Sequence, residues 1–281
     1  MHKLFSDESA CKDLYISSEI TPYVPENPVA LAGRFVPQAA QENGMEIRSF
    51  MPKYGCINER RNQLHEVIRL SGMNIVVSDV DRPLVIKVAS IPQARLQVYF
   101  IENEDYFKRK FIFRDEKDTF FADNAERAIL FARGVLETVK KLRWQPTIVH
   151  CNGWLANLVP LYLKKAYKAD PIFTDCKVIV SLYDEIAKER FSGNFSKKVL
   201  TGNLKPADVE LLNTPTGINL AKLAVKYADG VIAASRTLSK EVLDFAAKEK
   251  VPTLSFSEIT AGTDAAYTNR YIKFYGKFLK E

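Results

Sequence analysis

Polar and aromatic side chains that could bind a ligand follow a short strand-forming segment in the middle of the chain. Thr147 to His150 favour a strand, Asn152 and Trp154 come directly after it, and Leu155 to Lys165 have helical apolar spacing. Open α/β sheets bind ligands where a strand ends and a helix begins. A histidine can exchange protons, whereas Asn152 can only exchange hydrogen bonds near neutral pH. The alternative for His150 and Trp154 is structural: a histidine held by a backbone carbonyl and a core tryptophan.

A second group of candidates lies before and at the start of a helix predicted over residues 123–139. Asp123, with Glu126 three residues later, matches a capping box. Guanidinium groups form forked hydrogen bonds that suit phosphates and other oxygen-rich ligands. The functional interpretation is that Arg109 and Arg127 face a cleft beside Asp123 and Asn124. The structural interpretation is that Asp123 only caps the helix and Arg127 pairs with a surface acid.

The elements that must position these residues alternate between strands and helices. One predicted helix begins at Pro28, with Asn27 as its N-cap, and ends at Gly44. Another is expected at residues 218–228. Strands are predicted at residues 14–18, 45–51, 97–101, 147–150, 177–182 and 230–234. This alternation predicts a three-layer α/β/α domain with a mostly parallel sheet.

Three further segments have weaker patterns. Residues 59–69 have helical apolar spacing, and residues 74–77 and 84–89 are predicted to form a β-hairpin that turns at Asp81-Arg82-Pro83. Ala187 to Thr216 is expected to be a mobile lid or an irregular connector.

Composition narrows the class of protein. The 281 residues are 47% hydrophobic, which suffices for a sizeable core, and the net charge is +6. The basic residues are spread among almost as many acids, so no nucleic-acid partner is expected. No apolar run has the length of a membrane span, and the polar N-terminus does not resemble a signal peptide. We therefore expect a cytoplasmic protein without membrane partners, whose four isolated cysteines are reduced thiols.

The motifs, taken in order, resemble those of the glycogen and starch synthase family. Over about residues 12–264 they follow the family's order, which favours the interpretation that Arg109 and Arg127 face a cleft. The resemblance lies in Met51-Pro52-Lys53-Tyr54-Gly55 (family Met-Pro-x-Tyr-Gly), Tyr106 to Arg109 (Tyr-Phe-x-Arg), Asp123 to Arg127 (Asp-Asn-x-x-Arg), His150 to Trp154 (His-x-His-Asp-Trp) and Tyr227 to Val231 (Tyr-Ala-Asp-x-Val).

The loop after the first strand departs from that family. There the family has Lys-Thr-Gly-Gly-Leu-Gly-Asp, whose Lys and glycines contact the phosphates and glucose of the sugar nucleotide. Counting from Pro22, the Lys falls on Pro25 and the two glycines fall on Asn27 and Pro28. Proline has no backbone N–H to donate, so the usual phosphate-binding loop is not expected.

Two later motifs also differ. Asn152 stands in place of the family's second His, which contacts the transferred glucose, and Gly153 stands in place of the Asp. Tyr183-Asp184-Glu185 stands where the synthases have a His-Asn pair.

The resemblance implies a Rossmann-like domain that corresponds to the N-terminal half of a GT-B glycosyltransferase. One domain is expected over residues 1–281, with a family-like core at 12–264 and an aromatic-basic helical tail at 265–281. No residue is assigned as catalytic, and no metal or cofactor is expected. By resemblance, the substrate-binding residues are Arg109, Asp123, Asn124, Arg127, His150, Asn152 and Trp154.

The expected activity is transfer of glucose from ADP-glucose or UDP-glucose to an α-1,4-glucan with retention. In the family a second domain binds most of the nucleotide, so we expect the chain to need a C-terminal-half protein or a homo-oligomer. The alternative is a catalytically inactive homologue that binds glucan or a partner in glycogen metabolism. A weaker alternative is a sugar-phosphate or nucleotide sensor.

The tail carries one further prediction. Tyr271, Phe274, Tyr275 and Phe278 are spaced to form one apolar helical face. We expect this face to pack on the body of the chain or on a second copy.

Overall fold

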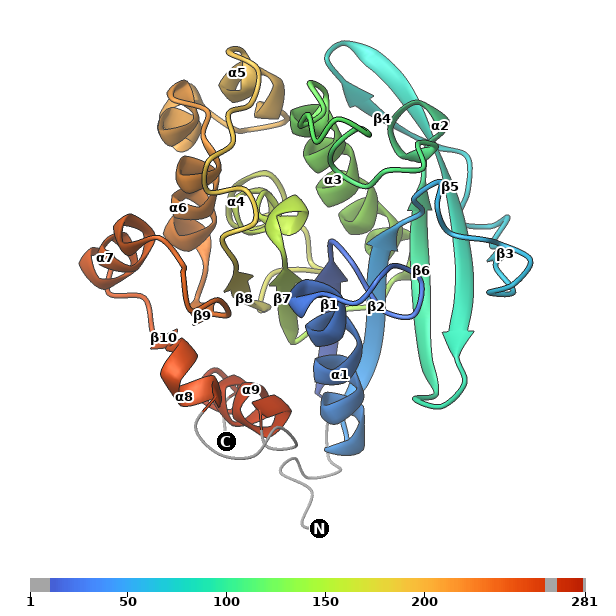
Figure 1. Ribbon diagram of the computed structural model, residues 1–281, viewed down its shortest axis with the longest axis horizontal. Helices are drawn as coiled ribbons and strands as arrows, with labels where there is room; N and C mark the ends of the chain where they lie inside the picture. Colours follow the sequence, from blue (N-terminus) through green and yellow to red (C-terminus); the bar gives the residue numbers. More distant parts are fainter. Residues whose placement is uncertain (1–10, 261–266, 280–281) are drawn as a thin grey trace.

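The computed structural model describes residues 11–260 and 267–279 (Figure 1). The strands are β1 Lys12–Ser17, β2 Glu46–Pro52, β3 His65–Glu66, β4 Met73–Val77, β5 Val80–Ile91, β6 Leu96–Glu102, β7 Ile148–Asn152, β8 Lys177–Leu182, β9 Gly230–Ala233 and β10 Thr253–Leu254. The α-helices are α1 Pro28–Glu42, α2 Glu104–Phe107, α3 Asn124–Leu142, α4 Val159–Leu161, α5 Phe195–Val199, α6 Gly217–Tyr227, α7 Lys240–Lys248, α8 Phe256–Thr260 and α9 Tyr267–Tyr275. Three other helical segments are η1 Trp154–Ala156, η2 Tyr162–Ala166 and η3 Pro206–Asn213.

The described strands form a mostly parallel sheet in the order β10-β9-β8-β7-β1-β2-β6-β5-β3, with β4 paired to β5. The pairs among β9, β8, β7, β1, β2 and β6 are all parallel, and β5 is antiparallel to its neighbours. The strand order reverses between β1 and β7, whose carboxyl ends therefore lie side by side where such folds bind ligands. The predicted α/β class and mostly parallel sheet are confirmed.

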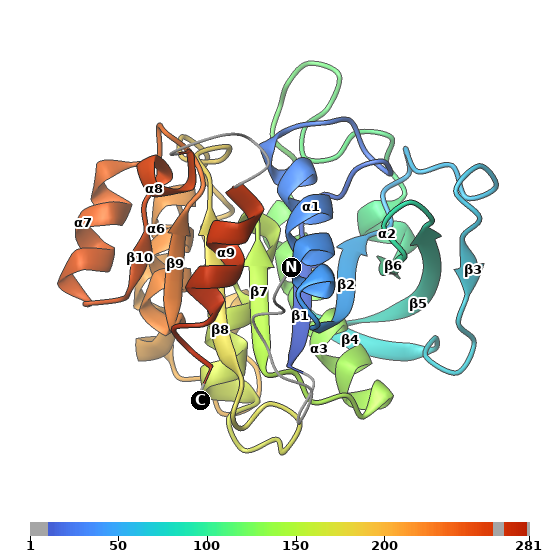
Figure 2. The same cartoon turned by 90° about the horizontal axis from the view of Figure 1, so that it is seen from below.

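Helices cover both faces of this sheet, because successive side chains of a strand point to opposite sides. Leu14 and Ile16 belong to the large core that also contains apolar residues of α3, α4 and α6. Tyr15 and Ile148 belong to a smaller core with residues of α1 and α9. Figure 2 shows α1 and α9 next to each other, in agreement with their mutual contacts. The result is the predicted three-layer arrangement.

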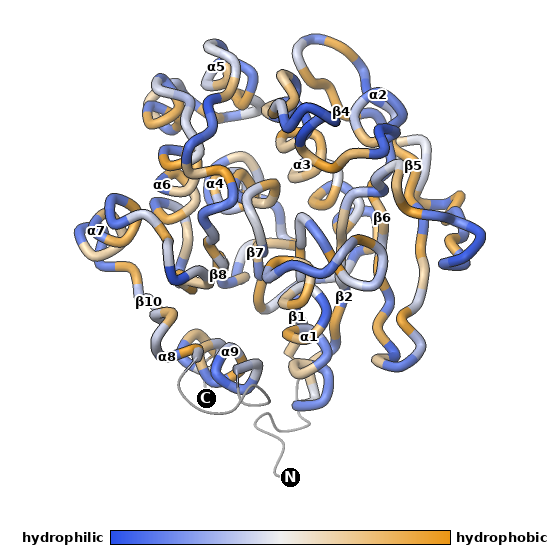
Figure 3. The backbone as a smooth tube through the Cα atoms, viewed as in Figure 1, coloured by the Kyte–Doolittle hydropathy of each residue, from blue (hydrophilic) through white to orange (hydrophobic). Residues whose placement is uncertain are grey.

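Two predictions for the segment before β6 are wrong. Residues 59–69 form turns and the two-residue β3 rather than a helix. The left-handed backbone of Gln63 (φ 52°) and the ion pairs of Glu59 with Lys53 and Lys87 favour this hydrophilic loop. It is largely blue in Figure 3, at the place where Figure 1 labels β3. The hairpin turns at Ser78 and the residue after it, both with positive φ, as tight two-residue turns require.

The hairpin strands are correspondingly longer than predicted. β5 includes Asp81, Arg82 and Pro83, which pair with Val76, Ile75 and Asn74 of β4, so these three residues are not the turn.

The other expected elements are found close to their predicted bounds. Asn27 caps α1 by accepting a hydrogen bond from the Ala30 N–H at 2.9 Å, and Pro28 is the first helical residue. The helical segment expected after β7 is divided among η1, α4 and η2. The connector at residues 187–216 contains α5 and η3 and contributes Phe195 and Leu212 to the core.

The tail packs on the body of the chain, which confirms that prediction. Tyr271, Phe274 and Tyr275 are buried against the sheet face that α1 also covers. Gly230 of β9 makes room for the end of this segment: a Cβ there would lie 2.6 Å from the ring of Phe278. The part of the predicted tail at residues 265–266 and 280–281 lies outside the described residues.

Candidate functional site

Asn152 ends β7 at the reversal point of the sheet, and its amide is fully engaged within the protein. Its Nδ2 donates to Ser17 Oγ and to the Val29 carbonyl, both at 2.9 Å, and its Oδ1 accepts from the Tyr183 hydroxyl at 2.8 Å. The side chain is completely buried. In this conformation both N–H groups are therefore used before any ligand arrives.

The residue after it must be glycine. Gly153 has a φ of 81°, and a Cβ at this position would lie 2.6 Å from Ser18 Oγ and 2.8 Å from a methyl group of Val29. Both the left-handed backbone and the lack of space exclude a larger side chain. The local packing therefore requires a glycine at position 153, where the family has an Asp.

His150 lies on the same face of β7 but deeper, beneath α9. Its two ring nitrogens contact the Tyr275 hydroxyl and, at 2.7 Å, Ser181 Oγ. Burial lowers the pKa of His150 to about 3, so the ring is neutral near pH 7. A buried neutral imidazole with both nitrogens engaged favours the structural interpretation of this residue.

Arg109 and Asp123 form a forked ion pair at the start of α3. The two N–O distances are 2.7 and 2.5 Å, and both side chains are partly exposed. Asp123 makes no capping hydrogen bond to the helix, so the predicted capping box is wrong. The carboxylate is instead held by an arginine fourteen residues earlier.

Arg127 is fully buried, so the expectation that it faces an open cleft is wrong. Its guanidinium donates to the Tyr106 carbonyl at 2.9 Å and to Asn124 Oδ1 at 2.6 Å. It also lies over the rings of Tyr54, Phe107, Phe113 and Phe121. Arg127 and Asn124 therefore tie the loop before α3 to the helix.

The loop after β1 is stabilised without a phosphate-binding arrangement. Asn27 caps α1 and also donates from Nδ2 to Glu19 Oε2 at 2.8 Å. Burial raises the pKa of Glu19, although the hydrogen bond from Asn27 opposes this shift. The loop thus places a carboxyl group beside Asn27, and Pro28 removes a backbone donor.

Trp154 leads into an aromatic groove. Its ring lies 4.9 Å from Phe113 and 5.8 Å from Phe120 and Phe191, measured between centroids. The adjoining groove has a volume of about 340 Å³ and is lined by Phe111, Ile112, Phe113, Arg114, Asp115, Asp118, Phe120, Glu185 and Ile186.

The charge in this groove is mainly acidic. Glu185 is exposed along the groove and accepts a hydrogen bond from the Trp154 N–H at 3.2 Å. Partial desolvation raises the pKa of the Glu185 carboxyl group, and repulsion from Glu19 adds to this shift. Arg114 is paired with Glu189 at 2.5 Å.

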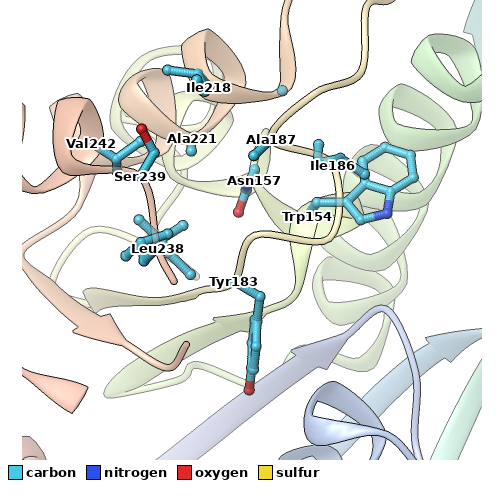
Figure 4. A pocket seen from close by; sticks show the side chains of 12 residues that line it. Trp154, Asn157, Tyr183, Ile186, Ala187, Ile218, Ala221, Leu238, Ser239 and Val242 are labelled. Atoms are coloured by element: carbon cyan, nitrogen blue, oxygen red, sulfur yellow. The ribbon is translucent and has the colours of Figure 1, made fainter. Parts of the chain in front are cut away.

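A narrower pocket lies on the other side of Trp154, between the ends of β7 and β8 and the starts of α6 and α7 (Figure 4). Its walls are mostly apolar, and Asn157 is 3% exposed with no hydrogen-bond partner for Oδ1 among the described residues. Figure 4 shows the Tyr183 hydroxyl turned away from this pocket, in the direction of β1.

The structure places His150 and Asn152 on the sheet face under α9 and α1. Trp154 packs instead among the phenylalanines of the large core, and the Arg109–Asp123 pair lies at the start of α3. Sequence reasoning missed Tyr183, Glu185 and the phenylalanines of the groove. The departure at Tyr183-Asp184-Glu185 was a signal for the first two. No cluster of three or more potential metal ligands exists within residues 11–260 and 267–279. No helix in the described part is long and apolar enough to cross a membrane.

Comparison with known proteins agrees with the family motifs found in the sequence. The model of the starch synthase catalytic domain matches residues 13–254. The chain belongs to this family.

Curated relatives support the assignment over the same region. The glycogen synthase of Chlorobium limicola is 35% identical over 233 residues, which are 83% of this chain and 47% of the relative. That of Chlorobaculum tepidum is 37% identical over 235 residues, 83% of this chain and 47% of the relative. The chain thus spans about half the length of the curated relatives it matches.

A solved structure supports the fold. The catalytic domain of starch synthase IV from Arabidopsis thaliana, bound to ADP and acarbose, aligns with a TM-score of 0.69 at 14% identity. The alignment covers 91% of this chain and 54% of the other. This likeness confirms the expected Rossmann-like α/β fold, which resembles one half of a GT-B glycosyltransferase.

Proposed function

We propose that this chain is a glycogen/starch synthase-type glucosyltransferase domain that binds an α-1,4-glucan and acts with the half that its relatives have beyond the matched region. The donor is ADP-glucose, with UDP-glucose as the alternative. The observation that carries the proposal is the aromatic groove beside Trp154, at the carboxyl end of the sheet.

The groove has the chemistry that a neutral sugar chain requires. Phe111 is 43% exposed and offers an apolar ring face, while Asp115 and Glu185 offer oxygen acceptors for sugar hydroxyl groups. Its volume of about 340 Å³ lies within the range of small-molecule sites. The carboxylates disfavour an anionic ligand, which supports the glucan rather than the nucleotide as the molecule bound here.

Transfer of glucose then depends on bringing the donor to this groove. The first loop has Pro25, Asn27 and Pro28 where the family has a cation and glycines, so the donor phosphates must be held chiefly by the other half. Correct positioning alone lowers barriers by roughly 7–11 kcal/mol. The site therefore gains most of its rate from a correctly docked second half, whether that is a C-terminal-half protein or another copy of the chain.

A second candidate is glucan binding without turnover, in a homologue that has lost catalysis. The specific observation in its favour is Asn152, whose two N–H groups are already engaged by Ser17 and Val29 where the family's second His contacts glucose.

Incorporation of radiolabelled glucose into glycogen separates these two functions. The purified chain is assayed with ADP-glucose and UDP-glucose, alone and with the separately purified C-terminal half of the Chlorobaculum tepidum relative. We expect incorporation only in the combined reaction. Incorporation by the chain alone would contradict the need for a second half, and none in any mixture, including one with cell extract, would leave the binding function.

Retention in glycogen-containing native gels tests the groove. Phe111→Ala should lose retention, because it removes the exposed ring, without a change in melting temperature. Phe35→Ala is the matched control, since Phe35 on α1 is similarly exposed at 39% but belongs to another surface. Equal retention of the two variants would show that the groove is not the glucan site.

A further inference from the structure

The aromatic groove lies between two separate parts of the chain. One wall is the groove hairpin, residues 111–121 between α2 and α3, and the other is the connector after β8 that contains Glu185 and Ile186. Figure 2 shows the hairpin as a green loop that projects from the body of the molecule. In the part of the chain that the structure describes, one hydrogen bond joins the two walls: Arg114 Nη2 donates to Glu189 Oε1 at 2.5 Å.

The groove hairpin is fixed at its base but not at its tip. At the base, Asn124 Nδ2 of α3 donates to the Phe113 carbonyl at 2.9 Å. Further out, the two arms form one isolated bridge pair, Arg114 with Phe120, and residues 116–119 are exposed. A two-stranded hairpin is only marginally stable by itself. The position of this tip therefore depends on the contacts that it makes with the rest of the molecule.

The connector on the other side is firmly held. The Glu189 carbonyl accepts a hydrogen bond from the Gly217 N–H at the start of α6 at 3.0 Å, and the Phe191 N–H donates to the Pro215 carbonyl at 2.8 Å. Ile186 and Phe191 also belong to the large core. The groove hairpin is thus the wall that can move, and Glu189 is a fixed point against which it can close.

The ion pair between the walls is suited to opening. The side chains of Arg114 and Glu189 are 34% and 20% exposed. Partly exposed ion pairs add little net stability, and salt screens them. Arg114 also donates to the Asp118 carbonyl at 3.0 Å, so its guanidinium moves with the hairpin. The pair can therefore open and close without unfolding either wall.

We propose that Arg114 and Glu189 are positioning residues of the glucan groove: their ion pair holds the groove hairpin against the connector and sets the width of the groove. This inference rests on the proposed function for its ligand, but the hold on the hairpin does not. Asp115 of the hairpin and Glu185 of the connector line one groove while the pair is closed. When it opens, a sugar chain loses simultaneous contact with both walls.

The pair is tested with Glu189→Gln, which removes the charge and keeps the shape of the side chain. Glu241→Gln is the matched control, because Glu241 forms a partly exposed pair with Lys222 at 2.9 Å between α6 and α7. Hydrogen exchange of the full chain, followed by mass spectrometry, reports the backbone amides of the hairpin. Calorimetry at low and high salt measures the affinity for maltoheptaose, which is uncharged, so any salt dependence comes from charges of the protein.

We expect faster exchange at residues 114–121 in Glu189→Gln and maltoheptaose binding that is about 2- to 5-fold weaker, the range of one partly exposed ion pair. Raising the salt from about 20 to about 500 mM should weaken binding by the wild type to a similar extent and leave Glu189→Gln unchanged. Glu241→Gln should behave as the wild type. Arg114→Glu and Glu189→Arg should each weaken binding, and the double reversal should restore it.

The contrary outcomes are equally specific. Equal affinity of the wild type and Glu189→Gln, or a double reversal as weak as its single variants, would overturn the proposal. A lower melting temperature with unchanged exchange in the hairpin would also overturn it, since the pair would then only stabilise the fold. If the wild type does not bind maltoheptaose, the proposed function fails, and the hold on the hairpin is judged by exchange alone. If Glu189→Gln does not fold, Arg114→Gln removes the same pair from the other wall.

Discussion

The two faces of the central sheet differ in chemistry, although alternate residues of the same strands form both. Beneath α3, α4 and α6 the strands present Leu14, Ile16, Val149 and Val180, all fully buried and apolar. The face beneath α1 and α9 also contains apolar residues, but it includes the fully buried polar side chains of Asp13, His150, Asn152 and Ser181. One face can supply stability by close packing alone, whereas the other must satisfy buried polar groups.

This difference indicates a division of roles within one sheet. A polar group that is buried and unpaired costs free energy, so a row of such groups is retained only where hydrogen bonds or a ligand use them. The polar row ends at Asn152, at the reversal point of the strand order. The effects of substitutions on the free energy of unfolding should therefore differ between the two faces in size, in sign and in dependence on pH.

The largest effect is expected on the apolar face. Ile16→Ala should lower the free energy of unfolding by about 2–5 kcal/mol, because it leaves a cavity in a fully buried strand. Its neighbour Tyr15 points to the other face and donates to the Ala32 carbonyl at 3.2 Å. Tyr15→Phe should cost only about 0.5–1.5 kcal/mol, the value of one hydrogen bond. Urea unfolding of both variants measures the two losses in free energy of unfolding. Equal losses would contradict the proposed division of roles between the two faces.

The next substitution, on the polar face, is expected to stabilise the protein. Asp13 is fully buried, and neither carboxyl oxygen has a partner among the described residues. Burial raises the pKa of Asp13 from 3.8 to about 8. The folded state therefore binds more protons than the unfolded chain between these values, and the free energy of unfolding falls as pH rises through that window. Asp13→Asn should remove this dependence and stabilise the protein by about 1–3 kcal/mol at pH 8.

Urea unfolding at pH 5 and pH 8 measures this prediction, with the exposed Asp244→Asn on α7 as control. The lowered pKa of His150, about 3 against 6.5, acts in the other direction: the unfolded chain binds more protons there, and stability falls as pH drops through that window. The Asp13→Asn variant should consequently show the acid loss more clearly than the wild type. A gain of the same size at both pH values would argue against an unpaired Asp13.

These groups also show what the sequence could and could not predict. The strand-forming segment from Leu14 to Ser17 and the capping of α1 by Asn27 are local patterns, so the strands and this helix were predictable. The partners of Asp123 and Arg127 were not, because Arg109 and Tyr106 reach them only through the folding of the intervening loop. A capping pattern records what a residue can do locally and not which distant group competes for it.

The same limit applies to the candidate site. The position of Asn152 at a strand end followed from the apolar segment before it. The departure from the family's phosphate-binding loop could be read directly at Pro25, Asn27 and Pro28. The saturation of the Asn152 amide did not, since its partners Ser17, Val29 and Tyr183 come from three separate elements or loops. The sequence also could not predict whether α9 packs on the body of the chain or on a second copy.

The smallest effect sharpens the comparison within the polar face, with two serines that lie on it. Ser181 contacts His150 at 2.7 Å, whereas Ser49 of β2, 1% exposed, has no partner for its hydroxyl among the described residues. Removing an unused buried hydroxyl is nearly neutral or stabilising, but removing a used one leaves its partner unsatisfied.

Ser49→Ala should accordingly change the free energy of unfolding by less than about 0.5 kcal/mol or raise it slightly, while Ser181→Ala lowers it by about 1–3 kcal/mol. Both substitutions remove one oxygen atom from a buried strand, so differences in helix or strand propensity largely cancel. Urea unfolding at pH 7 compares them directly. If Ser49→Ala lowered the free energy of unfolding as much as Ser181→Ala, burial of the hydroxyl group alone would decide the effect of its removal. The hydrogen bonds of the polar row would then add nothing beyond what any buried serine contributes.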